Sequence, residues 1–357
     1  MDQPPSQPRR GRGAASNPKN RYERCHVQVE DDGWGGLEAQ VQVRLPTRLI
    51  PMATRHILAR NRSPDVPFDR SVNPYRGCEH GCIYCFARPS HAQLGYSPGL
   101  DFETCIHYKP EAAERLREAL AAPGYVPAPL ALGINTDGWQ PVERRLRLSR
   151  QLLEVLLEAR HPVSIVTKSA LIERDIDLLA ALARRGLVHV ALSVTTLDTA
   201  LARRMEPRAT APPRRIETLR RLHQAGIPVG VLVAPVIPFL NDGEMERILA
   251  VCREAGAGYA GYVLLRLPHE VGSLFEEWLG HHYPERRARI LARIRDCHRG
   301  RRYDATFGHR MRGAGVYAQL VAARFRRACR RLGYGKPPAL EVRRFRPPGP
   351  GGQLSLF

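Results

Sequence analysis

The sequence has little cysteine, very little lysine and no long apolar run. Eight cysteines in 357 residues are too few for a disulfide framework, so we expect reduced thiols. No apolar run reaches the length that spans a membrane, and residues 1–20 lack the apolar centre of a signal peptide. We therefore expect a cytoplasmic protein without a membrane partner.

The basic side chains are overwhelmingly arginine. Of 55 basic residues, the only lysines are Lys19, Lys109, Lys168 and Lys336. The formal net charge of +20 predicts an anionic partner, and nucleic acid is the first candidate. However, genome base composition also enriches arginine, and a charged run is usually a solvated face. Charge alone favours nucleic-acid binding without deciding it.

Three of the cysteines lie together in one short segment. Cys78, Cys82 and Cys85 have the spacing C-x3-C-x2-C, with no fourth cysteine nearby. A closed structural zinc site needs four protein ligands. An iron–sulfur cube held by three thiolates instead leaves one iron open to a small molecule. The segment predicts chemistry at a metal; the alternative is a zinc-stabilised nucleic-acid-binding protein that uses the three cysteines and a histidine.

Beyond residue 101, short apolar runs alternate with amphipathic stretches, which is typical of βαβ units on a parallel sheet. The predicted strands are 130–134, 163–166, 188–192, 229–233 and 262–265. The predicted helices are 111–121, 145–159, 171–185, 214–225 and 244–254. A further strand leading into the cysteine segment makes six units, too few for a closed eightfold barrel. The predicted fold is α/β, an open, six-unit TIM-like barrel with a C-terminal helical extension.

The chain is predicted to divide into four regions. Residues 1–45 are polar, basic and glycine-rich and are expected to be disordered. The partial barrel takes residues 46–270. A basic helical extension follows over 271–340, with helices at 274–281, 285–299 and 316–332, and residues 341–357 form a flexible tail.

Polar residues follow several of the predicted strands. Ligands of parallel α/β folds bind at the carboxyl ends of the strands, where Asp137, Lys168 and Ser193 are found. Asp137 is expected to take the ammonium group of a zwitterionic amino acid, and Lys168 its carboxylate. The alternative is that such residues only cap the following helices. That alternative is weakest for Lys168, because lysine is so scarce in this chain.

The cysteine segment, with the aromatic Tyr84 before its third cysteine, resembles the signature of the radical S-adenosylmethionine superfamily. More narrowly, the chain resembles the branch related to spore photoproduct lyase. The matching segments lie between about residues 55 and 270 and are 73–78, 135–137, 166–168, 192–193 and 230–235. A closer resemblance, through residues 76–82 and 86–91, is to an uncharacterised bacterial subgroup.

The resemblance implies a [4Fe-4S] cluster on Cys78, Cys82 and Cys85, with S-adenosylmethionine on the fourth iron. It also implies that a reductant protein such as flavodoxin or ferredoxin supplies one electron. The electron cleaves S-adenosylmethionine to methionine and a 5′-deoxyadenosyl radical, which abstracts a substrate hydrogen. The residues that line the S-adenosylmethionine site by this resemblance are Tyr84 (beside the adenine), Thr136, Asp137, Lys168 and Ser193.

Two positions depart from the photoproduct lyases. Asn135 stands where those enzymes carry a cysteine that returns a hydrogen atom, and Phe86 replaces a tyrosine. Thymine-dimer repair by the same hydrogen return is therefore not expected. The candidate catalytic groups are Cys105, as a radical-quenching thiol, and His91, as a proton donor. We expect a radical enzyme acting on DNA, in repair or modification; the alternative is the same chemistry on RNA or protein.

The last five residues, Gln353-Leu354-Ser355-Leu356-Phe357, resemble the peptide by which bacterial polymerases and repair proteins dock on the β sliding clamp. In such a peptide Gln353 is expected to hydrogen-bond at the rim of a pocket that Leu356 and Phe357 fill, and the Pro/Gly linker 347–352 gives reach. The alternative is an accidental apolar terminus, because matches of five residues are common.

Deletion of Leu356 and Phe357 is expected to abolish co-purification with the clamp, because the deletion removes both side chains that fill the pocket. The measurement is recovery of the clamp with the tagged full chain and with the truncated chain. Undiminished recovery with the truncated chain would show that the tail does not bind the clamp.

Overall fold

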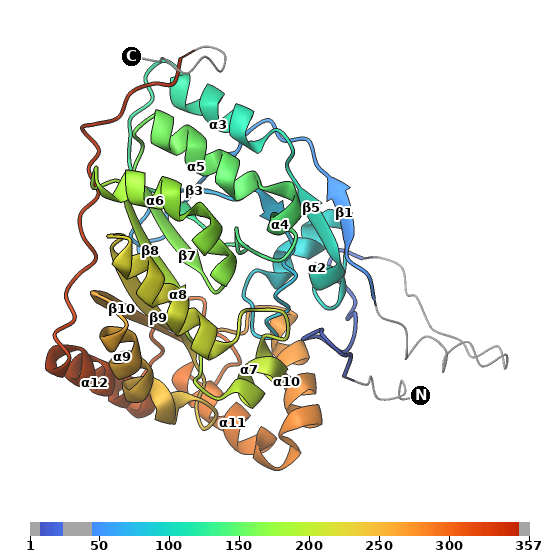
Figure 1. Ribbon diagram of the computed structural model, residues 1–357. Helices are drawn as coiled ribbons and strands as arrows, with labels where there is room; N and C mark the ends of the chain where they lie inside the picture. Colours follow the sequence, from blue (N-terminus) through green and yellow to red (C-terminus); the bar gives the residue numbers. More distant parts are fainter. Residues whose placement is uncertain (1–7, 24–44, 350–357) are drawn as a thin grey trace.

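A seven-stranded sheet forms the centre of the computed structural model, which describes residues 8–23 and 45–349. The strand order is β10-β9-β8-β7-β6-β3-β2 (Figure 1). Neighbouring strands from β3 to β10 run parallel, and β2 is antiparallel to β3. The strand bounds are β2 Leu58–Arg60, β3 Arg70–Val72, β6 Leu130–Leu132, β7 Val163–Thr167, β8 Val188–Ser193, β9 Val229–Val236 and β10 Tyr259–Leu264.

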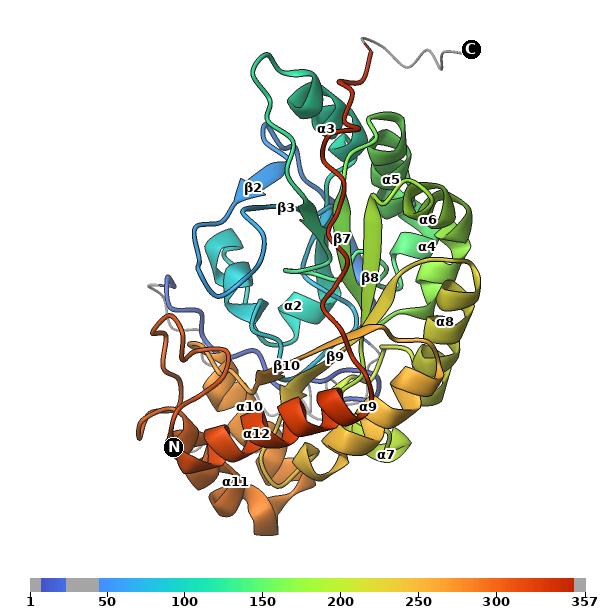
Figure 2. The same ribbon diagram turned by 90° about the vertical axis from the view of Figure 1, so that its left-hand side faces the viewer.

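The sheet curves into a partial barrel whose edge strands β10 and β2 do not pair with each other in the described part of the chain. The open, six-unit barrel predicted from the sequence is confirmed, and β3 is the strand that leads into the cysteine segment. Helices cover its outer face (Figure 2). Their bounds are α3 Ala112–Ala121, α4 Glu143–Leu146, α5 Leu148–Glu158, α6 Ile176–Ala183, α7 Thr199–Met205, α8 Pro212–Gln224 and α9 Met245–Glu254.

The core lies between the strands and these helices. The apolar runs of the strands are buried, as at Leu130, Ile165 and Val190. Each helix presents one apolar stripe to them, as α5 does with Leu152 and Leu156. Burying such side chains contributes about 1.5–3 kcal/mol each. The segments with a 3.6-residue apolar period therefore form the outer layer of helices, and the continuous apolar runs form the strands of the inner layer.

A second, three-stranded sheet was not predicted. Its order is β1 (Arg48–Pro51), β5 (Cys105–Tyr108) and β4 (Tyr75–Arg76), and the short helix α2 (Asp101–Thr104) runs directly into β5. Strands of two to four residues carry too little periodicity to be recognised. The sheet matters because β4 ends immediately before Gly77 and Cys78, and it therefore fixes the start of the cysteine segment.

The predicted helical extension is confirmed as α10 (Val271–His282), α11 (Pro284–Cys297) and α12 (Gly315–Arg331). The chain then returns along the barrel toward α3 (Figures 1 and 2). In this return, Glu341 N donates to Gly186 O at 2.9 Å, and Arg346 N donates to Ala159 O at 2.9 Å. The prediction of a flexible tail from residue 341 was therefore wrong for 341–346, because backbone bonds hold this part to the barrel.

None of the helices within 8–23 and 45–349 has the length and apolarity that a membrane span requires.

Candidate functional site

The cysteine segment is a buried loop at the carboxyl end of β3. Cys78 N donates to Phe102 O at 2.9 Å, and Ile83 N donates to Met205 O at 3.0 Å, so both sides of the loop are fixed. Cys78 and Cys82 are buried, and Cys85 is partly exposed. The predicted cluster cysteines are thus held on one short loop above the barrel strands.

The three thiols are close enough to affect one another. Burial raises the pKa of the Cys78 thiol well above its usual value, and Asp137, Cys82 and Cys85 raise it further. Burial likewise raises the pKa of the Cys82 thiol to about 11. A thiolate here needs a positive partner, and metal coordination deprotonates thiols outright. The donor set fits a cluster that takes one thiolate on each of three irons.

The zinc alternative requires four side chains around one ion. Across residues 8–23 and 45–349, no three His, Cys, Asp or Glu side chains converge in a way that suits a single metal ion.

A buried ion pair binds the backbone of the cysteine loop. Arg88 and Glu103 are both fully buried and contact each other. Arg88 Nε donates to Cys82 O at 2.9 Å, and the same guanidinium donates to Gly99 O at 2.8 Å. The carboxylate of Glu103 in turn accepts from Gly13 N and Ala14 N, both at 2.9 Å. One ion pair thus ties the loop to the segment before it in sequence.

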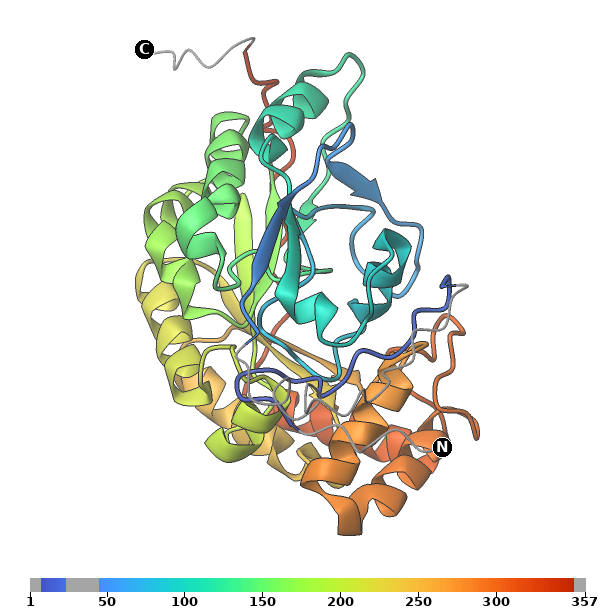
Figure 3. The same ribbon diagram turned by 90° about the vertical axis from the view of Figure 1, so that its right-hand side faces the viewer.

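The N-terminal segment passes across the cysteine loop (Figure 3). A Cβ added at Gly13 would lie 1.8 Å from Gly81 O, so the two backbones touch where only glycine fits. Gly81 itself has a φ of +67°. The prediction that residues 1–45 are disordered was therefore wrong for residues 8–23, whose structure is set by contacts distant in sequence.

A second buried network lies on the opposite side of the loop. Lys168 Nζ, at the end of β7, donates to Tyr84 Oη at 2.9 Å and lies 3.3 Å from Glu206 Oε1. Tyr84 Oη and Arg215 also contact Glu206 directly. Thr195 Oγ1 donates to Glu206 Oε1 at 2.7 Å. Two of the predicted residues, Tyr84 and Lys168, therefore meet at a carboxylate that was not predicted.

The network remains charged although it is buried. Burial alone would raise the pKa of the Glu206 carboxyl, but Arg215 and Lys168 outweigh it and hold that pKa well below its usual value. Burial alone would lower the pKa of Lys168, but the thiolate of Cys82 and the carboxylate of Glu206 raise it well above its usual value. Lys168 is therefore a fixed cation beside Cys82.

Asp137 joins the ends of two strands. Its Oδ1 accepts from Trp139 N at 2.9 Å and from Thr167 Oγ1 at 2.8 Å, and its Oδ2 accepts from Lys168 N at 2.9 Å. His80 Nδ1, from the cysteine loop, lies 3.5 Å from Oδ2. Asp137 thus stands between the cysteine loop and the backbone of Lys168.

The two predicted hydroxyls donate to backbone carbonyls. Thr136 Oγ1 donates to Tyr75 O at 3.0 Å, and Ser193 Oγ donates to Ala234 O at 3.1 Å. The carbonyl of Ser193 accepts from Arg215 at 2.9 Å. Ser193 thereby joins the Glu206 network, whereas Thr136 lies on the side of β4.

The two candidate catalytic groups lie behind the loop. His91 is fully buried, and neither of its ring nitrogens has a hydrogen-bond partner among the described residues. Its ring packs on Phe102 at 5.5 Å and on His107 at 5.8 Å. Burial lowers the pKa of His91 to about 4 and raises the pKa of the Cys105 thiol. A catalytic role for either residue stays a prediction.

Four important residues were not predicted: Arg88, Glu103, Glu206 and Arg215. Buried charges are rare unless paired, and pairing between distant positions leaves no spacing in the sequence. Glu206 is one carboxylate in a stretch rich in arginine, which is the one signal that could have drawn attention to it.

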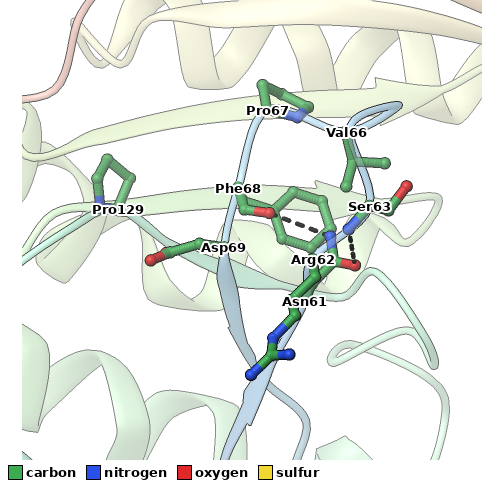
Figure 4. Close-up of a pocket in the computed structure, with 8 residues that line it drawn as sticks. All are labelled: Asn61, Arg62, Ser63, Val66, Pro67, Phe68, Asp69 and Pro129. Atoms are coloured by element: carbon green, nitrogen blue, oxygen red, sulfur yellow. Dashed lines mark hydrogen bonds between the residues drawn. The ribbon is translucent and has the colours of Figure 1, made fainter.

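Two cavities lie in the described structure near loops of the barrel. One, of about 450 Å³, is an open hollow lined by the β2–β3 connection and Pro129, and none of the predicted site residues lines it (Figure 4). The other, of about 500 Å³, lies beside the cysteine loop. It is lined by His80 of that loop, by Trp139 and Ser169 after the strands, and by the arginines Arg144, Arg208 and Arg214.

Comparison with known proteins assigns this arrangement to a family. Residues 72–252 match the family described as the Radical SAM superfamily. An uncharacterised protein of Mycobacterium tuberculosis is 37% identical over 246 residues, which cover 68% of this chain and 71% of the relative. An uncharacterised protein of Methanocaldococcus jannaschii is 26% identical over 215 residues, covering 60% and 76%.

The fold is similar to that of spore photoproduct lyase. A lyase mutant with bound AdoMet and dinucleoside spore photoproduct has a TM-score of 0.57 at 14% identity, covering 82% of this chain and 86% of the other. At this identity the likeness is one of fold.

Replacing Glu103 by Ala is expected to destabilise the protein by roughly 3–5 kcal/mol, because Arg88 would be left as a buried, unpaired charge. The measurement is the urea midpoint of the anaerobically purified protein. The matched control is Glu118→Ala, which removes an exposed partner of Arg115 and should leave the midpoint unchanged. Equal midpoints for the two variants would contradict the structural role of Glu103.

Proposed function

Because the chain belongs to the radical S-adenosylmethionine superfamily, we propose that this enzyme directs the radical it generates at a nucleotide unit of DNA. Enzymes of this family use a [4Fe-4S] cluster and S-adenosylmethionine. The cluster, once bound, supplies the electron that cleaves S-adenosylmethionine and releases the 5′-deoxyadenosyl radical. The observation that carries the proposal is the buried three-cysteine loop, which offers three thiolates to four irons.

We assign the cluster to Cys78, Cys82 and Cys85. Burial raises the pKa of Cys82 to about 11, which favours the protonated thiol. Coordination to iron would remove that proton and hold the side chain as the thiolate. The Arg88 side chain binds the backbone of Cys82 and fixes that ligand in place. Cys85 is partly exposed, whereas Cys78 and Cys82 are buried.

The amino-acid end of S-adenosylmethionine is assigned to the strand ends. A lysine ammonium has three N–H donors, and Lys168 uses two of them on Tyr84 and Glu206, which leaves one for a carboxylate. Asp137 accepts three hydrogen bonds from protein groups, and its remaining lone pair could take an ammonium. Tyr84, beside Lys168, would pack against the adenine.

Uncompensated arginine supports DNA as the target. On α12, Arg324 pairs with Glu246 at 2.7 Å. The four arginines that follow it are exposed and make no ion pair within the described residues: Arg326, Arg327, Arg330 and Arg331. Such a row binds phosphates without reading sequence. RNA remains the second candidate because a phosphate backbone is common to both.

Two protein partners are part of the proposal. A reductant such as flavodoxin or ferredoxin would deliver the electron. The cavity beside His80 is lined by Arg144 and by Arg208 and Arg214, of which the last two pair with Glu79 and Glu173. The β sliding clamp would bind Gln353, Leu354, Leu356 and Phe357, which lie outside the described residues.

The hydrogen-return step must differ from that of the photoproduct lyases. By the resemblance, Asn135 occupies the position of the cysteine that returns the hydrogen atom in those enzymes. The backbone N–H of Asn135 donates to Asn73 Oδ1 at 3.4 Å. The Phe86 ring carries no hydroxyl. Neither residue can donate a hydrogen atom as a thiol or phenol does.

The proposal predicts that deuterium moves from fully deuterated DNA into 5′-deoxyadenosine when the reduced holoenzyme is incubated with S-adenosylmethionine. Mass spectrometry of the nucleoside measures the transfer, and deuterated RNA is run alongside. Cys82→Ala, which removes a cluster ligand, should give neither 5′-deoxyadenosine nor transfer. Label arriving from RNA and not from DNA would reject DNA as the target.

A further inference from the structure

An exposed aromatic ring stands directly beside the cluster loop. Phe86 follows Cys85 in sequence and is 42% exposed, whereas its neighbours Tyr84 and Ala87 are 7% and 3% exposed. A phenyl ring left in solvent next to a metal ligand contributes nothing to the core. Its position therefore suggests a surface that something else covers.

A guanidinium from the end of β10 lies against this ring. The Arg266 Cζ atom is 4.9 Å from the centroid of Phe86. Two contacts from the segment after α11 hold it there, with Met311 Sδ at 3.1 Å and Tyr303 Oη at 3.4 Å. The ring and the cation thus come from opposite ends of the barrel sequence and are fixed relative to each other.

Arg266 has no carboxylate at ion-pair distance among the described residues; Asp65, which pairs with Arg310, attracts it from farther away. Arg266 makes no ion pair within the described residues, and its Nε is buried without a hydrogen-bond partner there. A buried N–H without a partner loses its hydrogen bonds to water and gains none in return, which is destabilising. Such a group is normally retained where a ligand satisfies it, and a guanidinium fits a phosphate oxygen well.

A similar pair elsewhere in the chain shows the contrast. Phe307 is 55% exposed, and the Arg310 Cζ atom lies 4.7 Å from its centroid. However, Arg310 is neutralised by Asp65 at 2.5 Å. Exposed Tyr22 likewise has Arg21 4.9 Å from its centroid, and Arg21 pairs with Glu270. Of these three ring–arginine pairs among the described residues, the one beside the cysteine loop is the one whose arginine makes no ion pair.

We propose that Phe86 and Arg266 form a nucleotide platform, on which a nucleobase stacks against Phe86 while Arg266 binds the adjoining phosphate. This deepens the proposed function and rests on it. Every nucleobase has a π-face, so stacking tolerates any sequence, and the arginine supplies the charge. Because Phe86 adjoins Cys85, the platform holds the base beside the point where the radical forms.

The test is binding of a fluorescent single-stranded oligodeoxynucleotide to the full-length, anaerobically prepared holoenzyme, followed by anisotropy over a range of salt concentrations. Phe86→Ala and Phe86→Leu should each raise Kd by roughly five- to 150-fold, the range for losing one base stack. Phe86→Trp should retain wild-type affinity. Arg266→Gln should reduce the slope of log K against log salt by about 0.7, the value for one phosphate contact on a single strand.

Phe307→Ala is the matched control and should leave Kd unchanged, because its arginine is already neutralised. The visible absorbance of the cluster is recorded for every variant to check that the cluster is present. If Phe86→Ala loses the cluster, Phe86→Leu still tests the stack, because leucine keeps the apolar bulk but has no aromatic ring.

The outcomes separate this inference from the proposed function. Wild-type affinity in Phe86→Leu, or an equal loss in Phe307→Ala, would overturn the platform and leave the DNA target standing. Phe86-dependent binding of RNA with no binding of DNA would support the platform and reject the DNA target. Failure of the wild-type protein to bind either nucleic acid would overturn both.

Discussion

The buried ion pair between Arg88 and Glu103 is the interaction on which the cysteine loop depends. Burying two charges costs several kcal/mol each, and the cost is recovered only where every remaining hydrogen-bonding position is used. Here the guanidinium binds carbonyls of the loop and of residues 98–99, while the carboxylate binds two N–H groups of the N-terminal segment. The pair stabilises one conformation of the loop that carries Cys78, Cys82 and Cys85.

The Glu206 network acts on the other side of the same loop. It connects Tyr84 of the loop with Lys168 after β7 and with Arg215 of α8. It holds two cations, Lys168 and Arg215, against the one carboxylate of Glu206, and that carboxylate together with Cys82 keeps the pKa of Lys168 well above its usual value. The loop is thus held between two buried charge clusters, one that sets the thiols and one that prepares the place assigned to S-adenosylmethionine. Rigid positioning of this kind is what a radical enzyme needs from its protein, since the cofactor supplies the chemistry.

The sequence was sufficient where a residue's role is visible in local pattern. The apolar runs at β7 and β8 predicted buried parallel strands, and the spacing of Cys78, Cys82 and Cys85 predicted the loop. It was insufficient where long-range contacts decide. From its sequence context, Gly13 is predicted to lie in a disordered region, whereas in the structure its backbone packs directly against Gly81. The two-residue strand β4 is too short to show a period. Glu103, the partner of Arg88, lies 15 positions away, and Lys168, a partner of Glu206, lies 38 positions away.

The central claim is that three thiolates leave one iron of the cluster open to S-adenosylmethionine. The most direct measurement is the electron paramagnetic resonance spectrum of the reduced, anaerobically prepared protein, with and without S-adenosylmethionine labelled with ¹⁵N in its amino group. The account predicts that the g-values shift when S-adenosylmethionine is added and that hyperfine coupling to ¹⁵N appears. An unchanged spectrum without that coupling would contradict the claim.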